Sequence, residues 1–164
     1  MTTEQDITKN SATEVPGVSN SIQIAEQLAS DLWQLAETWT DFAKTTMAIP
    51  LTRAMDEIGL QLRYTLGRTP IKQHLQHLEN ARKTLISVDY YLQLAQKRGL
   101  VETDHAKRLR SQMINLAQQL DRYRQAVVQA TNQKIAEREQ QQEKKLRAAS
   151  ENKEDANAST SVAH

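Results

Sequence analysis

Apolar residues recur every three or four positions along most of this chain, which is the period of an amphipathic helix. The first such stretch begins near Ser19 to Ser21 and ends before Pro50, because a residue that precedes proline is pushed out of the helical region. Its apolar stripe consists of Ala25, Leu28, Leu32, Leu35, Trp39 and Phe42. A second, short stretch stops at Gly67 and carries Leu51, Met55, Ile58 and Leu62.

Two further stretches follow, and both have clear ends. In the third, Thr69 is the expected N-cap, Pro70 the first helical residue and Gly99 the C-terminal cap. Its stripe consists of Ile71, Leu75, Leu78, Ala81, Leu85, Val88, Leu92 and Ala95. The fourth begins at Thr103 or Asp104, and its stripe consists of Leu109, Met113, Leu116, Leu120, Tyr123, Val127 and Ala130.

Four amphipathic helices joined by short loops predict an all-α fold, an up-down antiparallel four-helix bundle over residues 20–135. Residues 1–19 and 150–164 are small and polar, and we expect a disordered arm and a disordered tail there. Residues 136–149 keep helix propensity but hold a single large apolar residue, Leu146. We expect this segment to be a charged helical extension that frays and has no core of its own.

Composition narrows the class of protein further. The chain of 164 residues has no Cys, which excludes disulfides and thiolate chemistry and suits a reducing cytoplasm. Four Gly and three Pro are few for a fold of many short strands. We find neither an apolar run of the roughly 18 residues that a membrane span needs nor an apolar signal-peptide core near the N-terminus. A cytoplasmic protein without a membrane role is therefore expected.

The formal net charge of +1 conceals an asymmetry along the chain. Residues 1–66 carry nine acidic and four basic side chains, whereas residues 67–149 carry eight acidic and sixteen basic ones. Residues 150–164 add three acidic and one basic. A nearly neutral protein with a strongly basic half can bind a polyanion locally.

Catalytic and metal-binding patterns are weak in this sequence. His74 and His77 share a helix face, and Glu102 with His105 matches one Glu-x-x-His pair of a di-iron bundle. Such a site needs two pairs and inward-facing glutamates, whereas the inward positions here are apolar. No phosphate loop, nucleophile elbow or catalytic triad pattern is present. We expect no enzyme activity, no metal and no cofactor.

The basic residues are more informative, because several recur fourteen positions apart and so share a helix side. The candidate nucleic-acid or partner-binding residues are Arg68, Lys72, Arg82 and Lys83 in the third helix region, with Arg108, Arg110, Arg122 and Arg124 on the fourth. Three interpretations stay open: an ordinary solvated face, a phosphate-binding face, or a face that pairs with the acidic half of a neighbouring subunit. Trp33 and Tyr90–Tyr91 lie just off the apolar stripes and fit either a partly buried flank or an interface.

Part of the chain resembles a known family. The residues that carry the resemblance are LGRT at 66–69, LQHLENARKTL at 75–85 and YLQLAQKRGLV at 91–101. They are similar to the four-helix-bundle proteins encoded in intervening sequences of bacterial large-subunit ribosomal RNA genes, a family that includes the accessory variability determinant of diversity-generating retroelements. An Asn-Ile-Ala-Glu-Gly-like signature precedes the turn in common members. Here residues 64–67 read YTLG and match only in the glycine, so the chain resembles a divergent member.

The resemblance implies a function without catalysis. Accessory variability determinants assemble as homopentamers, bind a reverse transcriptase and nucleic acid, and support mutagenic cDNA synthesis from a template RNA. On this basis we expect a homo-oligomer whose partners are a reverse transcriptase and template RNA or cDNA. The alternative is an oligomeric protein–protein adaptor with no nucleic-acid role, in which the basic residues meet acidic protein surface.

Overall fold

The computed structural model describes residues 18–67 and 69–160, with side chains described up to residue 151 apart from 68. The elements are α1 (Val18–Glu37), α2 (Asp41–Ala43), the π-helix η1 (Lys44–Ala48), α3 (Ile49–Tyr64), α4 (Ile71–Lys97) and α5 (Thr103–Thr160). These ranges contain no strand. The chain forms two compact units, Met1–Val127 and Val128–His164. The predicted division into arm, bundle, extension and tail remains a prediction, and residues 1–17 and 161–164 lie outside the described residues.

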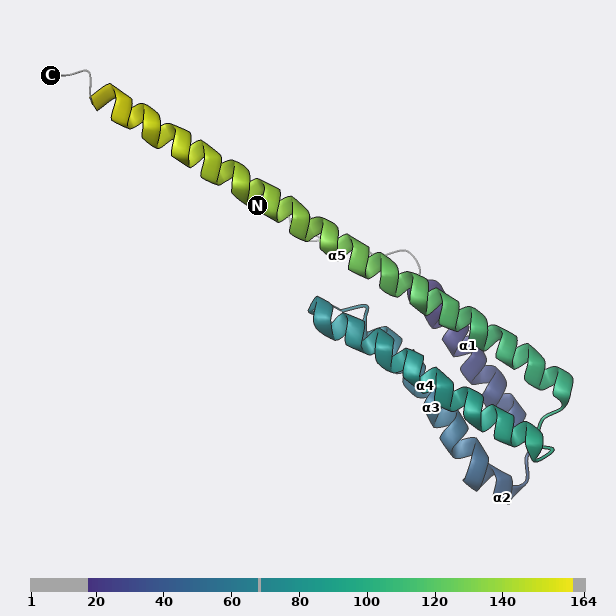
Figure 1. Ribbon diagram of the computed structural model, residues 1–164. Helices are drawn as coiled ribbons and strands as arrows, with labels where there is room; N and C mark the ends of the chain where they lie inside the picture. The colour runs from purple at the N-terminus through teal and green to yellow at the C-terminus, as the bar shows by residue number, and fades with distance from the viewer. Residues whose placement is uncertain (1–17, 68, 161–164) are drawn as a thin grey trace, which may run out of the picture. The chain divides into compact units, whose positions relative to one another are not determined.

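The first unit is an antiparallel four-helix bundle, as predicted. Figure 1 shows α1, α3, α4 and the part of α5 before Val128 running alongside one another. Two ion pairs show that α4 and α5 run in opposite directions, because the later residue of α4 pairs with the earlier residue of α5. Side-chain bonds connect every pair of neighbouring helices around the bundle. These bonds are Glu26–Arg63 between α1 and α3, Gln61–His77 between α3 and α4, Arg82–Asp121 and Asp89–Arg110 between α4 and α5, and Asn20–Gln119 between α1 and α5.

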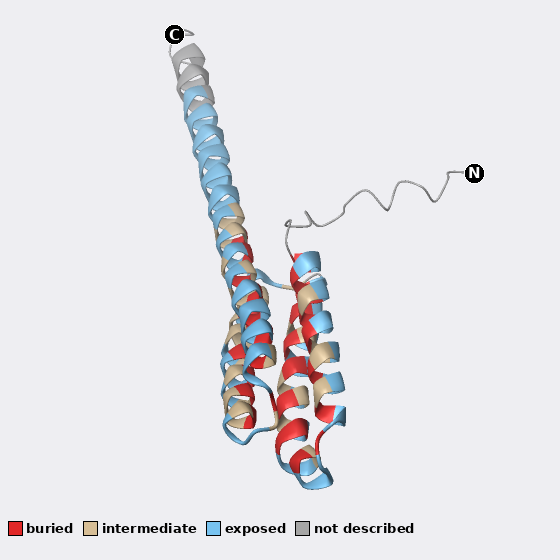
Figure 2. Ribbon diagram, turned by 90° about the vertical axis from the view of Figure 1, so that its right-hand side faces the viewer, coloured by how far each residue is buried: buried red, intermediate tan, exposed pale blue. Residues whose placement is uncertain are grey.

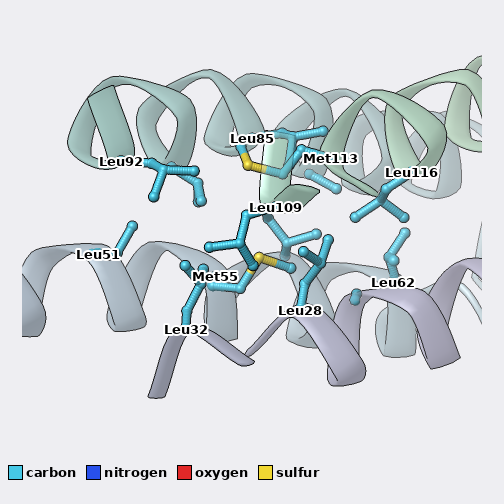
Figure 3. Packing of buried hydrophobic residues seen from close by; sticks show 14 of the residues in the cluster. Leu28, Leu32, Leu51, Met55, Leu62, Leu85, Leu92, Leu109, Met113 and Leu116 are labelled. Atoms are coloured by element: carbon cyan, nitrogen blue, oxygen red, sulfur yellow. The ribbon is translucent and has the colours of Figure 1, made fainter. Parts of the chain in front are cut away.

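The core lies along the shared axis of these helices. The buried residues face inward on every helix, as Figure 2 shows in red. Leucines and methionines from all four helices interlock there, among them Leu32, Met55, Leu85 and Leu109 (Figure 3). Each buried Leu or Met side chain contributes about 1.5–3 kcal/mol relative to an exposed one. The predicted stripes of α3 and α5 are buried almost throughout, so periodicity located this core correctly.

The boundary between the first two helices differs from the prediction. α1 ends at Glu37, twelve residues before the expected end, and Thr40 caps the next helical run by accepting the Ala43 N–H at 3.3 Å. Pro50 then lies in the first turn of α3 instead of breaking a helix. Its ring would crowd the preceding turn of a regular α-helix. The wider π-helical turn before it, in which the Ile49 N–H donates to the Lys44 carbonyl, relieves that crowding.

This shift removes one predicted core residue from the interior. Phe42 is 78% exposed, and Ala43 and Met47 are buried in its neighbourhood instead. The break at Thr38–Thr40 ends the α1 register, so the 3,4 spacing does not carry across it. Ile71 is also exposed, since it is the first residue of α4. Leu35 and Leu75 are only partly buried against the core.

Only the C-terminal end of α4 agrees with the prediction. Gly99 has φ of +73°, and the Leu100 N–H and Gly99 N–H donate to the carbonyls of Ala95 and Gln96. This is the Schellman arrangement, in which a glycine accepts the left-handed conformation at little cost. At the other end Pro70 occupies the N-cap position in an extended conformation. Thr69 is not the cap: its hydroxyl donates to the Tyr64 carbonyl at 3.1 Å.

The second unit, beyond Val127, is the remainder of α5. Every residue from 132 to 151 is exposed, including Ile135 and Leu146, and Figure 2 shows this part in pale blue. A helix that is polar on all sides obtains little stability from burial. The backbone stays helical to Thr160.

Candidate nucleic-acid interface

The four arginines of α5 divide between two sides of the helix. Arg110 bonds to Asp89 of α4, so its side of α5, which Arg124 shares at a spacing of fourteen, faces α4. Gln119 accepts a hydrogen bond from Asn20 of α1 at 2.8 Å. Arg108 and Arg122 lie eleven residues before and three residues after Gln119, positions that return to the same helix side. These four arginines of α5 therefore border two grooves of the bundle, one between α4 and α5 and one between α1 and α5.

Two of the predicted residues are ion-paired across the α4–α5 groove. Arg82 Nε lies 3.0 Å from Asp121 Oδ1, and Arg110 Nε lies 2.8 Å from Asp89 Oδ1. The Gln93 amide also donates to Asp89 and holds that carboxylate in place. The two pairs border a shallow hollow in which Ile86 and Ile114 are exposed. These two arginines are partly neutralised and fixed in position. The sequence did not reveal the pairs, because each arginine and its carboxylate lie on different helices.

The other predicted basic residues differ in whether they form an ion pair. Lys83 pairs with Glu79 along α4 at 3.6 Å, a contact that is weak on an exposed helix surface. Arg68 lies outside the described residues. The remaining four are exposed and form no ion pair within the part of the chain whose side chains are described: Lys72, Arg108, Arg122 and Arg124.

The charge asymmetry of the sequence becomes an asymmetry between two sides of the bundle. Residues 18–64, which form α1 to α3, contain six acidic and three basic side chains. Residues 71–127, which form α4 and the bundle part of α5, contain five acidic and ten basic ones. Because α1 packs on α3 and α4 packs on α5, cations collect on one side of the bundle. A surface of this kind attracts phosphates within about a Debye length.

A polar cluster connects α3, α4 and α5 near the start of α4. His74 Nε2 and Tyr123 Oη lie 2.9 Å apart, and His77 Nδ1 lies 2.8 Å from Gln61 Oε1. Burial lowers the pKa of the His74 imidazole from its ordinary value of 6.5, and His77 nearby adds to the effect. Burial also raises the pKa of the Tyr123 hydroxyl, although its hydrogen bond to Thr65 opposes the shift. His74 and His77 are thus half-buried members of a hydrogen-bonded cluster.

Within the described residues no three His, Asp or Glu side chains are grouped so that they could hold a metal ion. No helix among them has an apolar stretch long enough to cross a membrane. Trp33 and Tyr90 are more than half exposed, and the Trp33 indole N–H donates to Glu37 at 3.0 Å. Tyr90 packs edge-on against Tyr91 with ring centroids 5.6 Å apart.

The His74 environment predicts a pH dependence of stability. The folded protein keeps this imidazole neutral below the pH at which an unfolded histidine gains a proton, so the unfolded state binds more protons there. The free energy of unfolding should therefore decrease as the pH falls through 6.5. Changing His74→Gln keeps a polar partner for Tyr123 and removes the titration. Urea denaturation of the wild type and the variant at about pH 7.5 and about pH 5 should show that the free energy of unfolding decreases less in the variant. An equal decrease in both proteins would contradict the assignment.

Comparison with known proteins places this bundle in a family. The family model described as 23S rRNA-intervening sequence protein matches residues 19–122, which is most of the first unit and nearly all of its core. No curated protein sequence matches the chain. The match covers more than half of the 164 residues and includes α1 to α4 and the α4–α5 groove. The chain belongs to the 23S rRNA-intervening sequence protein family.

Proposed function

We propose that this protein is a non-catalytic nucleic-acid-binding subunit that holds RNA or cDNA on the basic side of its bundle. The observation that carries the proposal is the set of exposed cations without carboxylate partners, Lys72, Arg108, Arg122 and Arg124. Arginine favours bidentate contacts with phosphate, and three of the four are arginines on one helix. Membership of a family named after ribosomal RNA genes supports a role with nucleic acid.

The mechanism would be electrostatic positioning. Phosphate contacts fix the orientation of a nucleic acid but do not read its sequence. The rigid bundle fixes the spacing of the cations, and the ion pairs of Arg82 and Arg110 hold α4 and α5 in register beneath them. Sequence preference should therefore come from RNA shape or from a partner protein.

The partner we propose is a reverse transcriptase, with template RNA or cDNA as the nucleic acid of a diversity-generating retroelement. The sequence resemblance to accessory variability determinants carries this part, together with the basic side of the bundle. We also propose that the protein forms a homo-oligomer of five subunits, like the accessory variability determinants that the sequence resembles. In the alternative function, an oligomeric adaptor, the basic side of one subunit meets the acidic α1–α3 side of another protein chain.

Replacing Arg122→Glu and Arg124→Glu together tests the phosphate surface. Both side chains are exposed and form no ion pair within the described residues, so helicity by circular dichroism should not change. Arg110 is a poorer choice, because a glutamate there would face Asp89. Affinity for structured RNA, measured by fluorescence anisotropy, should fall by roughly tenfold or more. The slope of log affinity against log salt should fall by about two.

A matched control is the double change Lys44→Glu and Arg53→Glu, which alters net charge by the same amount on the acidic side of the bundle. It should weaken RNA binding much less. Equal weakening by both variants would show that net charge, not this surface, governs binding.

Light scattering during size exclusion tests self-association. We expect a mass near five chains, with an absorbance ratio that reveals co-purified nucleic acid. A monomer free of nucleic acid would contradict both the oligomer and the tight binding of nucleic acid by the purified protein.

A further inference from the structure

A second surface, outside the predicted basic residues, lies at the end of the bundle where η1 approaches the α4–α5 turn. A hollow of about 550 Å³ opens there, and its lining includes Phe42, Met47, Arg98 and Leu100. Two threonines, Thr40 and Thr46, also border it. The hollow combines an apolar floor with a single cation and an exposed aromatic ring.

Phe42 is held firmly at the edge of this hollow. It is the single phenylalanine of the chain, and it is 78% exposed. Its carbonyl accepts hydrogen bonds from the hydroxyls of Thr45 and Thr46 at 3.0 and 2.7 Å. Its helical run is capped by Thr40 and continues through the π-helical turn into α3. The backbone beneath the ring is therefore fixed, and a flat apolar surface is presented to solvent.

Arg98, a cation with few partners, lines the same hollow as this ring. Its backbone is fixed at the end of α4, where its N–H donates to the Leu94 carbonyl and Gly99 follows with positive φ. Its guanidinium contacts the Met47 sulfur, a weak acceptor, and forms no ion pair within the described side chains. A guanidinium carries five N–H donors, so most of its capacity is open to an external anion. Lys97 beside it is also exposed and without an ion pair in the same described part of the chain.

We propose that this hollow binds an unpaired nucleotide of a single-stranded nucleic acid, with the base stacked on Phe42 and the phosphate on Arg98. The inference rests on the proposed nucleic-acid function and adds a preference for single strands. A base inside a duplex is already stacked on its neighbours and cannot present a face to Phe42, whereas a phosphate is equally available in both forms. Aromatic stacking next to a cation is the combination that single-strand-binding surfaces use. The pairing of Arg98 with phosphate is favoured by charge and by the fork of donors that guanidinium offers.

The test uses the full-length protein and two RNAs of the same sequence, one single-stranded with a central 2-aminopurine and one fully paired. Stacking of 2-aminopurine on Phe42 should quench its fluorescence in the wild type. Phe42→Ala should remove the quenching and weaken single-strand binding by about fivefold to a hundredfold, while duplex affinity stays unchanged. Phe42→Trp should restore both. Arg98→Ala should weaken single-strand binding, but the 2-aminopurine of RNA that still binds should remain quenched by Phe42.

Tyr90→Ala is the matched control, because Tyr90 is an exposed aromatic residue of α4 that does not line the hollow. Equal effects of Phe42→Ala and Tyr90→Ala, or equal losses for single strand and duplex, would overturn the inference. So would unchanged RNA binding by Phe42→Ala combined with lost binding of an acidic peptide, which would assign the hollow to a protein partner.

The failure of this inference can be separated from the failure of the proposed function. If Arg122→Glu with Arg124→Glu weakens RNA binding and Phe42→Ala does not, the basic side stands and the hollow is not a nucleotide site. If the wild type binds neither RNA, both proposals fail.

Discussion

The burial of one apolar seam shared by four helices is the interaction on which the rest of this structure depends. Residues such as Leu32, Ile58, Leu92 and Leu116 are fully buried, and each contributes about 1.5–3 kcal/mol by leaving water. The ion pairs between helices are half-exposed and are worth about 0–1 kcal/mol each. The seam therefore supplies the stability. The polar bonds, with their fixed partners, set the register of one helix against the next.

That division of roles explains how a surface of unpaired cations can be tolerated. Like charges on α4 and α5 repel one another, but the repulsion between solvated side chains is small next to the burial of the seam. The bundle also separates the charges by helix: α1 carries the acidic excess, α3 has as many basic as acidic side chains, and α4 and the bundle part of α5 carry the basic excess. The helices fix the backbone positions of the unpaired arginines, so little backbone ordering remains to be done when an anion binds.

The sequence predicted the seam well and the polar contacts poorly, for physical reasons. Periodicity within a helix locates its buried face, so nearly all predicted residues of α3 and α5 are buried. The helical period does not continue across a break in a helix. Phe42 follows the capped turn at Thr40 and is therefore exposed, contrary to the prediction. Pro50 misled the prediction because the π-helical turn before it relieves a clash that usually ends a helix.

Contacts between helices lay beyond the reach of the sequence. The fourteen-residue spacing of the arginines indicates which of them share a side of α5. Which of them are paired depends on Asp89 and Asp121, whose approach is fixed only once α4 and α5 pack together. The half-buried His74–Tyr123 pair depends on the same packing and had no signal in the spacing of the histidines.

The central claim is that unpaired cations on the α4–α5 side bind phosphate. The most direct test is the affinity of the wild-type protein for a structured RNA over a series of salt concentrations. The account predicts that log affinity falls linearly with log salt, with a slope of about −0.7 to −0.9 for each phosphate neutralised and hence about −3 for four cations. An affinity that is independent of salt, or the absence of RNA binding at low salt, would contradict it and favour a protein–protein adaptor.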